Sequence, residues 1–221
     1  MTVDQDRLNK VKSIQRPDCL KFEEFDLAYN VETFGPRKLS TDGLKQIQPA
    51  VHENSDLVLG SNGYQPTALY WIDVVNDYLN SNEDLSKYSF VDIGCGKGKV
   101  IFHNLSQNQN YKEYIGIEAD ENFYNIAVKN LKTTNIKINK NLSFYHINAL
   151  DYDYNQDHVI YYFFYPFSKE IFDSIFNNNL LKMKNKNNYL VFIFESDFEV
   201  ESVVGYPPVF VNEAITIYKL D

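Results

Sequence analysis

The chain has 221 residues, of which 44% are hydrophobic and 23% are charged, an ordinary composition for one globular unit with a well-buried core. It carries a net charge of −9, no apolar run near the roughly 20 residues that a membrane-spanning helix needs, no apolar signal-peptide core, and two cysteines without metal-type or disulfide-framework spacing. We therefore expect a cytoplasmic protein that holds no metal, spans no membrane and does not bind nucleic acid along its phosphate backbone.

Residues 1–63 contain mixed polar and aromatic stretches. The segment KFEEFDLAYNVETFG leaves room for a short helix, and GSNGYQ is typical of a loop. The apolar content of this region is too small to bury a core alone. We therefore predict a helical and loop-forming extension that packs on a main domain formed by residues 64–221.

An amphipathic helix is predicted over 66–81, where Pro66 suits the first turn because its missing N–H costs nothing there. Farther along, short β-like runs alternate with helical runs, which is typical of a parallel sheet with crossover helices. Strands are expected at 89–94, 113–119, 142–149, 158–165 and 188–196. Helices are expected at 100–107, 121–133 and 168–183. The chain is thus expected to form a single Rossmann-like α/β domain with a mostly parallel sheet.

The tail, residues 207–220, looks like one or two strands, and we expect an antiparallel terminal pair. No full helix is expected between this tail and the strand that ends at Ser196. The run KMKNKNN at 182–188 is the best candidate for a basic patch. We interpret it as a solvated helix end and loop, because charge runs usually are.

Three of the nine glycines, Gly94, Gly96 and Gly98, lie in the stretch FVDIGCGKGKV. They follow a strong strand and precede a helix, where glycine permits tight turns and a close approach of the backbone to a ligand. A dinucleotide motif G-x-G-x-x-G would place its third glycine where this chain has Lys99. Asp92, two residues before the first glycine, would not help a pyrophosphate. It would suit a ligand that carries an ammonium group and no phosphate.

The pattern D-x-G-x-G-x-G resembles the first motif of class I S-adenosylmethionine-dependent methyltransferases, and the resemblance covers roughly residues 64–220. It implies a Rossmann-like fold and S-adenosyl-L-methionine as cofactor. It also implies that Asp92 and the loop residues Gly94, Cys95 and Gly96 contact that cofactor. The alternative is a plain turn from strand to helix.

Glu118 ends the second predicted strand, 26 residues after Asp92 and near the offset at which a carboxylate meets ribose hydroxyls in nucleotide-binding folds. The resemblance implies that Glu118 binds the ribose and that Ala119 beside it belongs to the cofactor site. After the third strand, Asn148 and Ala149 match the family positions that contact adenine, with Asp151 as a rival for the polar role. The alternatives are a solvated carboxylate and a simple turn.

Amino-directed members of the family carry Asn/Asp-Pro-Pro-Tyr/Phe or Asn-Pro-Phe after the fourth strand, where this chain has FFYPF. Tyr165 stands at the polar position and is the candidate catalytic residue, because a phenol hydroxyl both donates and accepts. This change puts methylation of an amide or a base amine in doubt. Tyr64 and Thr67 match a Tyr-x-Pro loop that covers the methionine end of the cofactor, although Thr67 also suits a helix cap.

The function expected from this resemblance is methyl transfer from S-adenosyl-L-methionine to an amine or hydroxyl of a protein lysine, a small metabolite or a sugar. The N-terminal extension is expected to shape the pocket for that acceptor. Two alternatives stay open: a non-catalytic cofactor-binding module and an NAD-dependent oxidoreductase, which the glycine spacing disfavours. None of the four histidines lies in a recognisable catalytic pattern.

Overall fold

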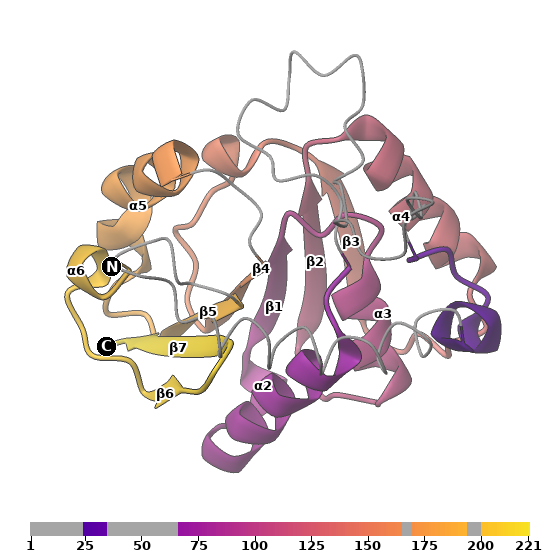
Figure 1. Cartoon of the computed structure of the whole chain (residues 1–221), viewed down its shortest axis with the longest axis horizontal. Coiled ribbons are helices and arrows are strands. Elements are labelled where there is room, and N and C mark those ends of the chain that lie inside the picture. Colours follow the sequence, from indigo (N-terminus) through magenta and orange to yellow (C-terminus); the bar gives the residue numbers. More distant parts are fainter. Residues whose placement is uncertain (1–23, 35–65, 165–168, 194–199) are drawn as a thin grey trace, which may run out of the picture.

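A computed structural model describes residues 24–34, 66–164, 169–193 and 200–221. At its centre is a seven-stranded sheet with the order β3-β2-β1-β4-β5-β7-β6 (Figure 1). The strands are β1 (Ser89–Ile93), β2 (Glu113–Glu118), β3 (Asn141–His146), β4 (Val159–Phe164), β5 (Asn188–Ile193), β6 (Phe210–Val211) and β7 (Ile215–Leu220). The first five strands pair in parallel, whereas β7 runs antiparallel to both β5 and β6. The expected mostly parallel sheet with antiparallel terminal strands is confirmed.

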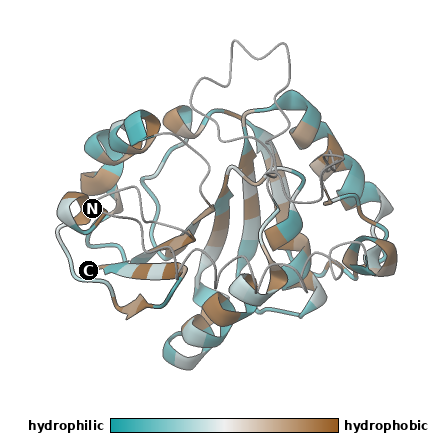
Figure 2. Cartoon of the chain, in the orientation of Figure 1, coloured by the Kyte–Doolittle hydropathy of each residue, from teal (hydrophilic) through white to brown (hydrophobic). Residues whose placement is uncertain are grey.

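Helices cover both faces of the sheet. They are α2 (Leu69–Asn82), α3 (Lys99–Ser106), α4 (Glu121–Thr133), α5 (Lys169–Met183) and α6 (Val200–Val204), with short 3-10 turns η1 (Leu85–Lys87) and η2 (Ala149–Asp151). The α2, α3 and α4 helices pack on one face, and α5 and α6 pack on the other (Figure 1). In Figure 2, α4 and α5 carry both hydrophilic and hydrophobic residues, as helices that cover a sheet do.

Several predicted elements differ from the structure. The strand expected at 142–149 is β3, which already ends at His146. The α2 helix begins at Leu69 rather than at Pro66, because Ala68 has an extended conformation with ψ of 135° and serves as the N-cap residue. A single helical turn, α6, fills part of the stretch where we expected no full helix. Ser168, the expected cap of α5, lies outside the described residues.

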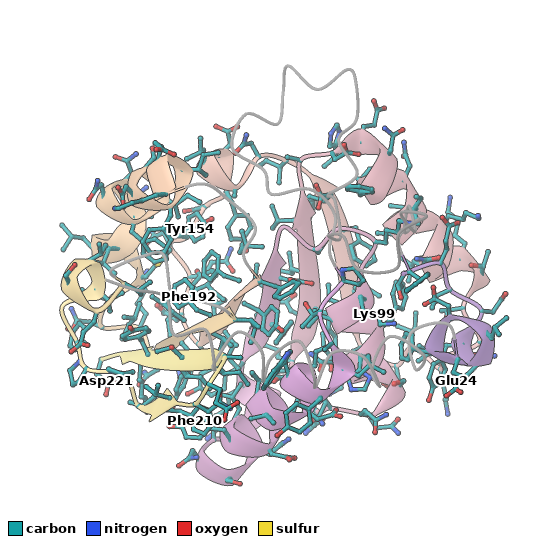
Figure 3. All side chains as sticks on the ribbon, viewed as in Figure 1. Glu24, Lys99, Tyr154, Phe192, Phe210 and Asp221 are labelled. Atoms are coloured by element: carbon teal, nitrogen blue, oxygen red, sulfur yellow. The ribbon has the colours of Figure 1, made fainter. Side chains whose placement is uncertain are left out.

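The central strands are apolar nearly throughout because each is covered on both faces. All five residues of β1 are buried, as are all six of β5. Tyr154 and Phe192 pack on the α5 side of the sheet, whereas Lys99 lies on the opposite side, toward the helix that carries Glu24 (Figure 3).

The strand order reverses at β1, which has β2 on one side and β4 on the other. In open α/β sheets, the connections on the two sides of such a point lead away from each other and leave a crevice at the carboxyl ends of the strands. The glycine-rich stretch follows the end of β1 directly. The fold therefore places this loop where such sheets bind their ligands.

Candidate functional site

The glycine-rich loop turns sharply between β1 and α3. Gly94, Gly96 and Gly98 have φ of 76°, 52° and 84°, in the left-handed region that glycine adopts most readily. A Cβ at Gly98 would lie 2.9 Å from both Phe102 and Phe144, so no other residue fits there without a shift. The α3 helix therefore begins close to the end of β1, with the N–H groups of its first turn next to the loop.

Backbone hydrogen bonds tie the loop to the end of β2. The N–H groups of Gly94 and Cys95 donate to the carbonyl of Ile117 at 2.8 and 2.9 Å. The Cys95 side chain is buried, and burial raises the pKa of its thiol, so it remains a neutral apolar group. Cys95 thus contributes packing and its backbone to the loop.

Asp92 is a buried carboxyl in the middle of the sheet. It pairs in register with Gly116 on β2 and Tyr162 on β4, and its side chain is 3% exposed. Within the described part of the chain, its Oδ2 atom has no hydrogen-bond partner. Burial, followed by repulsion from Glu118, raises its pKa to about 8. A buried acceptor of this kind gains stability from a ligand that brings a donor or a positive charge.

Glu118 lies at the carboxyl end of β2 and faces the same loop. Its Oε2 accepts a hydrogen bond from the Gly96 N–H, and its Oε1 accepts one from the Asp120 N–H, both at 2.7 Å. Burial raises the pKa of Glu118, and these backbone donors oppose that shift. Each carboxylate oxygen keeps a second lone pair, so the same group can still accept hydrogen bonds from hydroxyls.

The end of β3 contributes the next part of this edge. Ile147 N–H donates to the Glu118 carbonyl at 3.1 Å, and a ring nitrogen of His146 lies 3.0 Å from the carbonyl of Ala119. Asn148 caps η2, because its Oδ1 accepts from the Leu150 N–H at 2.9 Å. Ala149 is buried at the start of η2. The turn expected as an alternative for this stretch is therefore present, beside the end of β2.

The remaining predicted residues fall into two groups. Tyr64 and Tyr165 lie outside the described residues. Thr67 is buried just before α2 and lies close to Tyr162. Burial, and next the charge of Asp92, raise the pKa of the Tyr162 phenol. The sequence does not mark Tyr162 as a site residue, because it shows only a phenol in an apolar strand. The pairing of β1 with β4 places this phenol beside Asp92.

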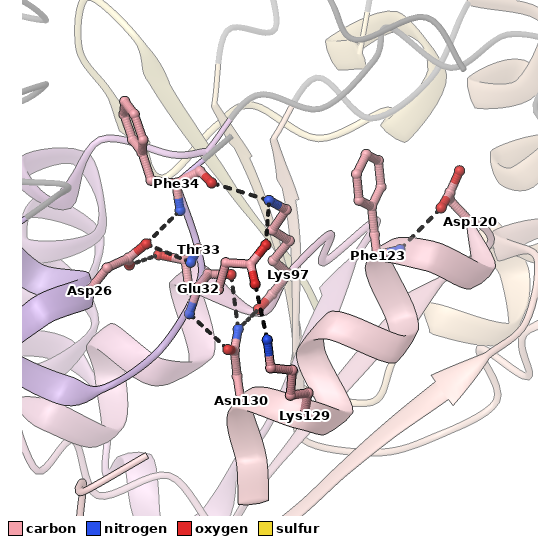
Figure 4. A network of polar contacts seen from close by, with 9 residues as sticks. All are labelled: Asp26, Glu32, Thr33, Phe34, Lys97, Asp120, Phe123, Lys129 and Asn130. Atoms are coloured by element: carbon pink, nitrogen blue, oxygen red, sulfur yellow. Dashed lines mark hydrogen bonds and ion pairs between the residues drawn. The ribbon is translucent and has the colours of Figure 1, made fainter. Parts of the chain in front are cut away.

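A second set of residues missed from the sequence connects residues 24–34 to the loop (Figure 4). Residues 24–29 form a helix, as the segment predicted. Lys97 and Lys99, on either side of Gly98, form ion pairs with Glu32 at 3.5 Å and Asp26 at 3.8 Å. Both lysine side chains are nearly fully buried. Lys99, at the position of the third glycine of a dinucleotide motif, thus binds the N-terminal segment.

The basic run at 182–188 lies at the opposite end of the sheet from the loop. The carbonyl of Lys186 accepts from His158 N–H at the start of β4, and its ammonium group contacts Asn155 and Asp157. Lys182 bonds to Asn179 at 2.8 Å. These contacts fit the expected helix end and loop.

Among the residues that the structure describes, no three or more histidine, cysteine or acidic side chains gather as they would around a metal ion. No described helix has both the length and the apolar content to cross a membrane.

Residues 86–177 match the model of a family described as "Putative methyltransferase". A comparison of the sequence with curated proteins finds no match.

Solved structures share the fold at low sequence identity. The "rRNA methyltransferase aviRa from Streptomyces viridochromogenes" has a TM-score of 0.54 and 8% identity, covering 74% of this chain and 89% of the other. The "Putative methyltransferase yhhF from Escherichia coli" has a TM-score of 0.51 and 18% identity, covering 72% and 89%. A "predicted N6-adenine-specific DNA methylase from Listeria monocytogenes" has a TM-score of 0.51 and 12% identity, covering 71% and 52%. The chain thus has the Rossmann-like fold of these methyltransferases, and its residues 86–177 are similar to the family described as "Putative methyltransferase".

Proposed function

We propose that this protein binds S-adenosyl-L-methionine at the edge formed by β1, β2 and β3 and transfers its methyl group to an amine or hydroxyl acceptor. The observation that carries the proposal is a pair of buried carboxyls on adjacent strands, Asp92 and Glu118, on either side of a glycine turn. Two neighbouring carboxylates repel each other, which disfavours an anionic ligand such as a pyrophosphate. A ligand with an ammonium group, a sulfonium and ribose hydroxyls suits both.

The residues present fit this cofactor. Asp92 would hold the ammonium group, because its Oδ2 is a buried acceptor without a hydrogen-bond partner in the described residues. Glu118 would accept from the ribose hydroxyls. The backbone of Gly94, Cys95 and Gly96 would line the cofactor, with Thr67 and Tyr64 at its methionine end. The adenine would lie against Ala119, Asn148 and Ala149.

The cofactor supplies an activated methyl group for in-line displacement. The protein has to align the acceptor and exclude water from the site. Tyr165 and Tyr64 stay our candidates for the acceptor side, where a hydroxyl or an ammonium acceptor has to lose a proton. We retain the division into an extension at 1–63 and a methyltransferase domain at 64–221 as part of this proposal, with the extension shaping the acceptor pocket.

The acceptor class is the least constrained part of the proposal. Two neighbours in fold are described as acting on rRNA or DNA, and at 8% and 12% identity this likeness concerns the fold. Charge favours a different acceptor here. Lys97 and Lys99 are engaged by Glu32 and Asp26, and the basic run lies at the far end of the sheet, so neither offers free positive charge beside the loop. We therefore propose a protein lysine, a small metabolite or a sugar as acceptor.

Calorimetric titration with S-adenosylmethionine, S-adenosylhomocysteine and NAD tests the cofactor. We expect saturable binding of the first two and none of NAD. Saturable heat with NAD alone would overturn the proposal in favour of an oxidoreductase.

Incubation with radiolabelled S-adenosylmethionine and a lysate separated into protein, nucleic acid, lipid, polysaccharide and metabolite fractions tests the acceptor. We expect label in the protein, metabolite or polysaccharide fraction. Label in nucleic acid would overturn the acceptor assignment and leave the cofactor assignment intact. Binding of the cofactor without transfer to any fraction would favour a non-catalytic module. Tyr165 in place of the polar residue that amino-directed methyltransferases carry before Pro166 is consistent with that alternative.

A further inference from the structure

A buried polar network joins residues 28–34 of the N-terminal segment to the glycine loop through Asn130 of α4. Asn130 is 1% exposed. Its Oδ1 accepts from the Glu32 N–H at 2.7 Å, and its Nδ2 donates to the carbonyls of Glu32 at 3.0 Å and Lys97 at 3.1 Å (Figure 4). One amide side chain thus holds the segment and the loop in a single arrangement.

Lys97 makes the same connection from the loop side. Its Nζ donates to the Phe34 carbonyl at 3.1 Å and lies 3.5 Å from a Glu32 oxygen, while its own carbonyl is held by Asn130. The side chain is 4% exposed. A buried ammonium group is costly unless its donors are bonded, so the docked segment stabilises Lys97 in this position through the Phe34 carbonyl and the Glu32 carboxylate.

The segment is itself organised to present these groups. The Asp26 carboxylate accepts hydrogen bonds from the N–H and hydroxyl of Thr33 and from the Phe34 N–H. This closed turn orients the Phe34 carbonyl that binds Lys97. Asp26 also pairs with Lys99, whose ammonium group lies 4.1 Å from the centre of the Phe25 ring.

Lys97 follows Gly96 directly, and Gly96 donates to Glu118. The geometry points to Lys97 and Asn130 as positioning residues that couple the docking of residues 28–34 to cofactor binding by the glycine loop. This inference rests on the proposed cofactor site. If the loop has one arrangement that both binds the cofactor and presents Lys97 to Phe34, then each event favours the other by the same free energy.

The wild-type protein provides a test that needs no substitution. Hydrogen exchange is measured for the amides of Glu32, Thr33 and Phe34 with and without saturating S-adenosylhomocysteine. We expect the ligand to slow exchange of these three amides by about tenfold, the scale of a typical coupling. Amides of α5 serve as the reference. Unchanged exchange at Glu32, Thr33 and Phe34 under saturation would overturn the inference.

The variants Lys97→Met and Asn130→Ala test the same coupling from the ligand side. We expect each to weaken S-adenosylhomocysteine binding by about tenfold and to abolish the ligand-dependent protection of residues 32–34. If Lys97 and Asn130 only stabilise the fold, the variants should melt at a lower temperature but bind S-adenosylhomocysteine as tightly as the wild type and keep the ligand-dependent protection of residues 32–34. That result would overturn the inference.

Lys129→Met is the matched control. Lys129 also contacts Glu32, at 3.3 Å, but it is exposed on α4 and makes no contact with the loop in the described structure. We expect a change in affinity below about twofold, because exposed ion pairs contribute little.

Two outcomes separate this inference from the proposed function. If the wild-type protein fails to bind S-adenosylhomocysteine, the proposed function is refuted. If the wild type binds tightly and Lys97→Met and Asn130→Ala bind with the same affinity, only the coupling is refuted.

Discussion

The two layers that cover the sheet are built from different residues. The layer on the α5 side is a core of stacked and tilted rings, in which Phe163, Phe172, Phe176 and Phe192 contact one another. The layer formed by α2, α3 and α4 is also apolar, but it buries many polar and charged groups. These are Asn76, Asp92, Lys97, Lys99, His103, Asn104 and Asn130.

This difference separates stability from ligand binding. Aromatic contacts contribute free energy of folding in proportion to the area that they bury. Buried polar groups contribute little net stability and cost much when they are left unpaired, but they define one geometry. The glycine loop lies in the layer formed by α2, α3 and α4, which contains the buried polar groups. We therefore expect substitutions in the α5 layer to change unfolding and substitutions around the loop to change ligand affinity.

The largest effect is expected in the aromatic layer. Phe176 is fully buried, and its ring centre lies 4.5 Å from that of Phe172. We expect Phe176→Ala to lower the free energy of unfolding by about 3–5 kcal/mol, through lost burial and the cavity left behind. Urea denaturation measures this loss. Leu181→Ala, at a side chain 86% exposed on the same helix, should stay within about 0.5 kcal/mol of the wild type. A weaker ligand affinity in folded Phe176→Ala protein would break the separation of the two layers.

The next effect concerns Glu118. We expect Glu118→Ala to weaken S-adenosylhomocysteine binding by at least about 1.5 kcal/mol, the scale for losing a charged hydrogen-bond acceptor. Calorimetry measures the loss, with exposed Glu121→Ala on α4 as control. Because Glu118 also holds the loop through Gly96, the 2′-deoxy analogue of S-adenosylhomocysteine separates the two roles. If Glu118 contacts the ribose, the wild type should bind S-adenosylhomocysteine more tightly than its 2′-deoxy analogue, and Glu118→Ala should bind the two ligands about equally. If the wild type and the variant show the same ratio of the two affinities, Glu118 does not contact the ribose.

The smallest effect has opposite signs for stability and binding. The pKa of Asp92 is raised from 3.8 to about 8 in the folded protein. Burial of Asp92 therefore does not lower the free energy of unfolding through ionisation below pH 3.8. Its cost grows as the pH rises and reaches its full size above about pH 8. We expect Asp92→Asn to increase unfolding free energy by about 1 kcal/mol at pH 8, to have no such effect at pH 4, and to weaken S-adenosylhomocysteine binding. Thermal unfolding across this pH range measures the gain.

The wild type should also release protons on binding at pH 7, because a bound ammonium group favours ionised Asp92. Calorimetry in buffers of different ionisation enthalpy detects this release, and Asp92→Asn should abolish it. Asp77→Asn, at an exposed position on α2, is the control. A variant that is less stable at pH 8 and binds as tightly as the wild type would contradict the role assigned to Asp92.

Local patterns predicted much of the fold. The helix expected at 121–133 is α4 with the same bounds, because its apolar spacing and the capping carboxylate of Asp120 are both local. The central strands were found because apolar runs between turn residues are typical of covered strands. The start of α2 was placed too early, since Pro66 is compatible both with a first helical turn and with the extended chain that precedes it.

Local patterns also predicted some residues of the candidate site and not others. The glycines, Asp92 and Glu118 stand in one recognisable spacing, and parallel strands bring their carboxyl ends to one edge. Tyr162 and Asn130 carried no such spacing. A phenol in a strand and an amide in a helix are common and do not by themselves indicate a site. Tyr162 lies beside Asp92, which is 70 positions away in the sequence. Asn130 binds the carbonyl of Lys97, which is 33 positions away.

The sequence by itself determined the alternation of strands and helices, the glycine turn and the two carboxyls that frame it. These follow from backbone sterics, hydrophobic periodicity and residues close together in the chain. Only the tertiary structure decided that Asp92 is buried, with an oxygen that accepts no hydrogen bond from the described residues, that Glu118 holds the loop, and that Lys97 binds the segment at residues 28–34. Burial and pairing of charge depend on which distant segments meet, and that contact is a property of the folded chain as a whole.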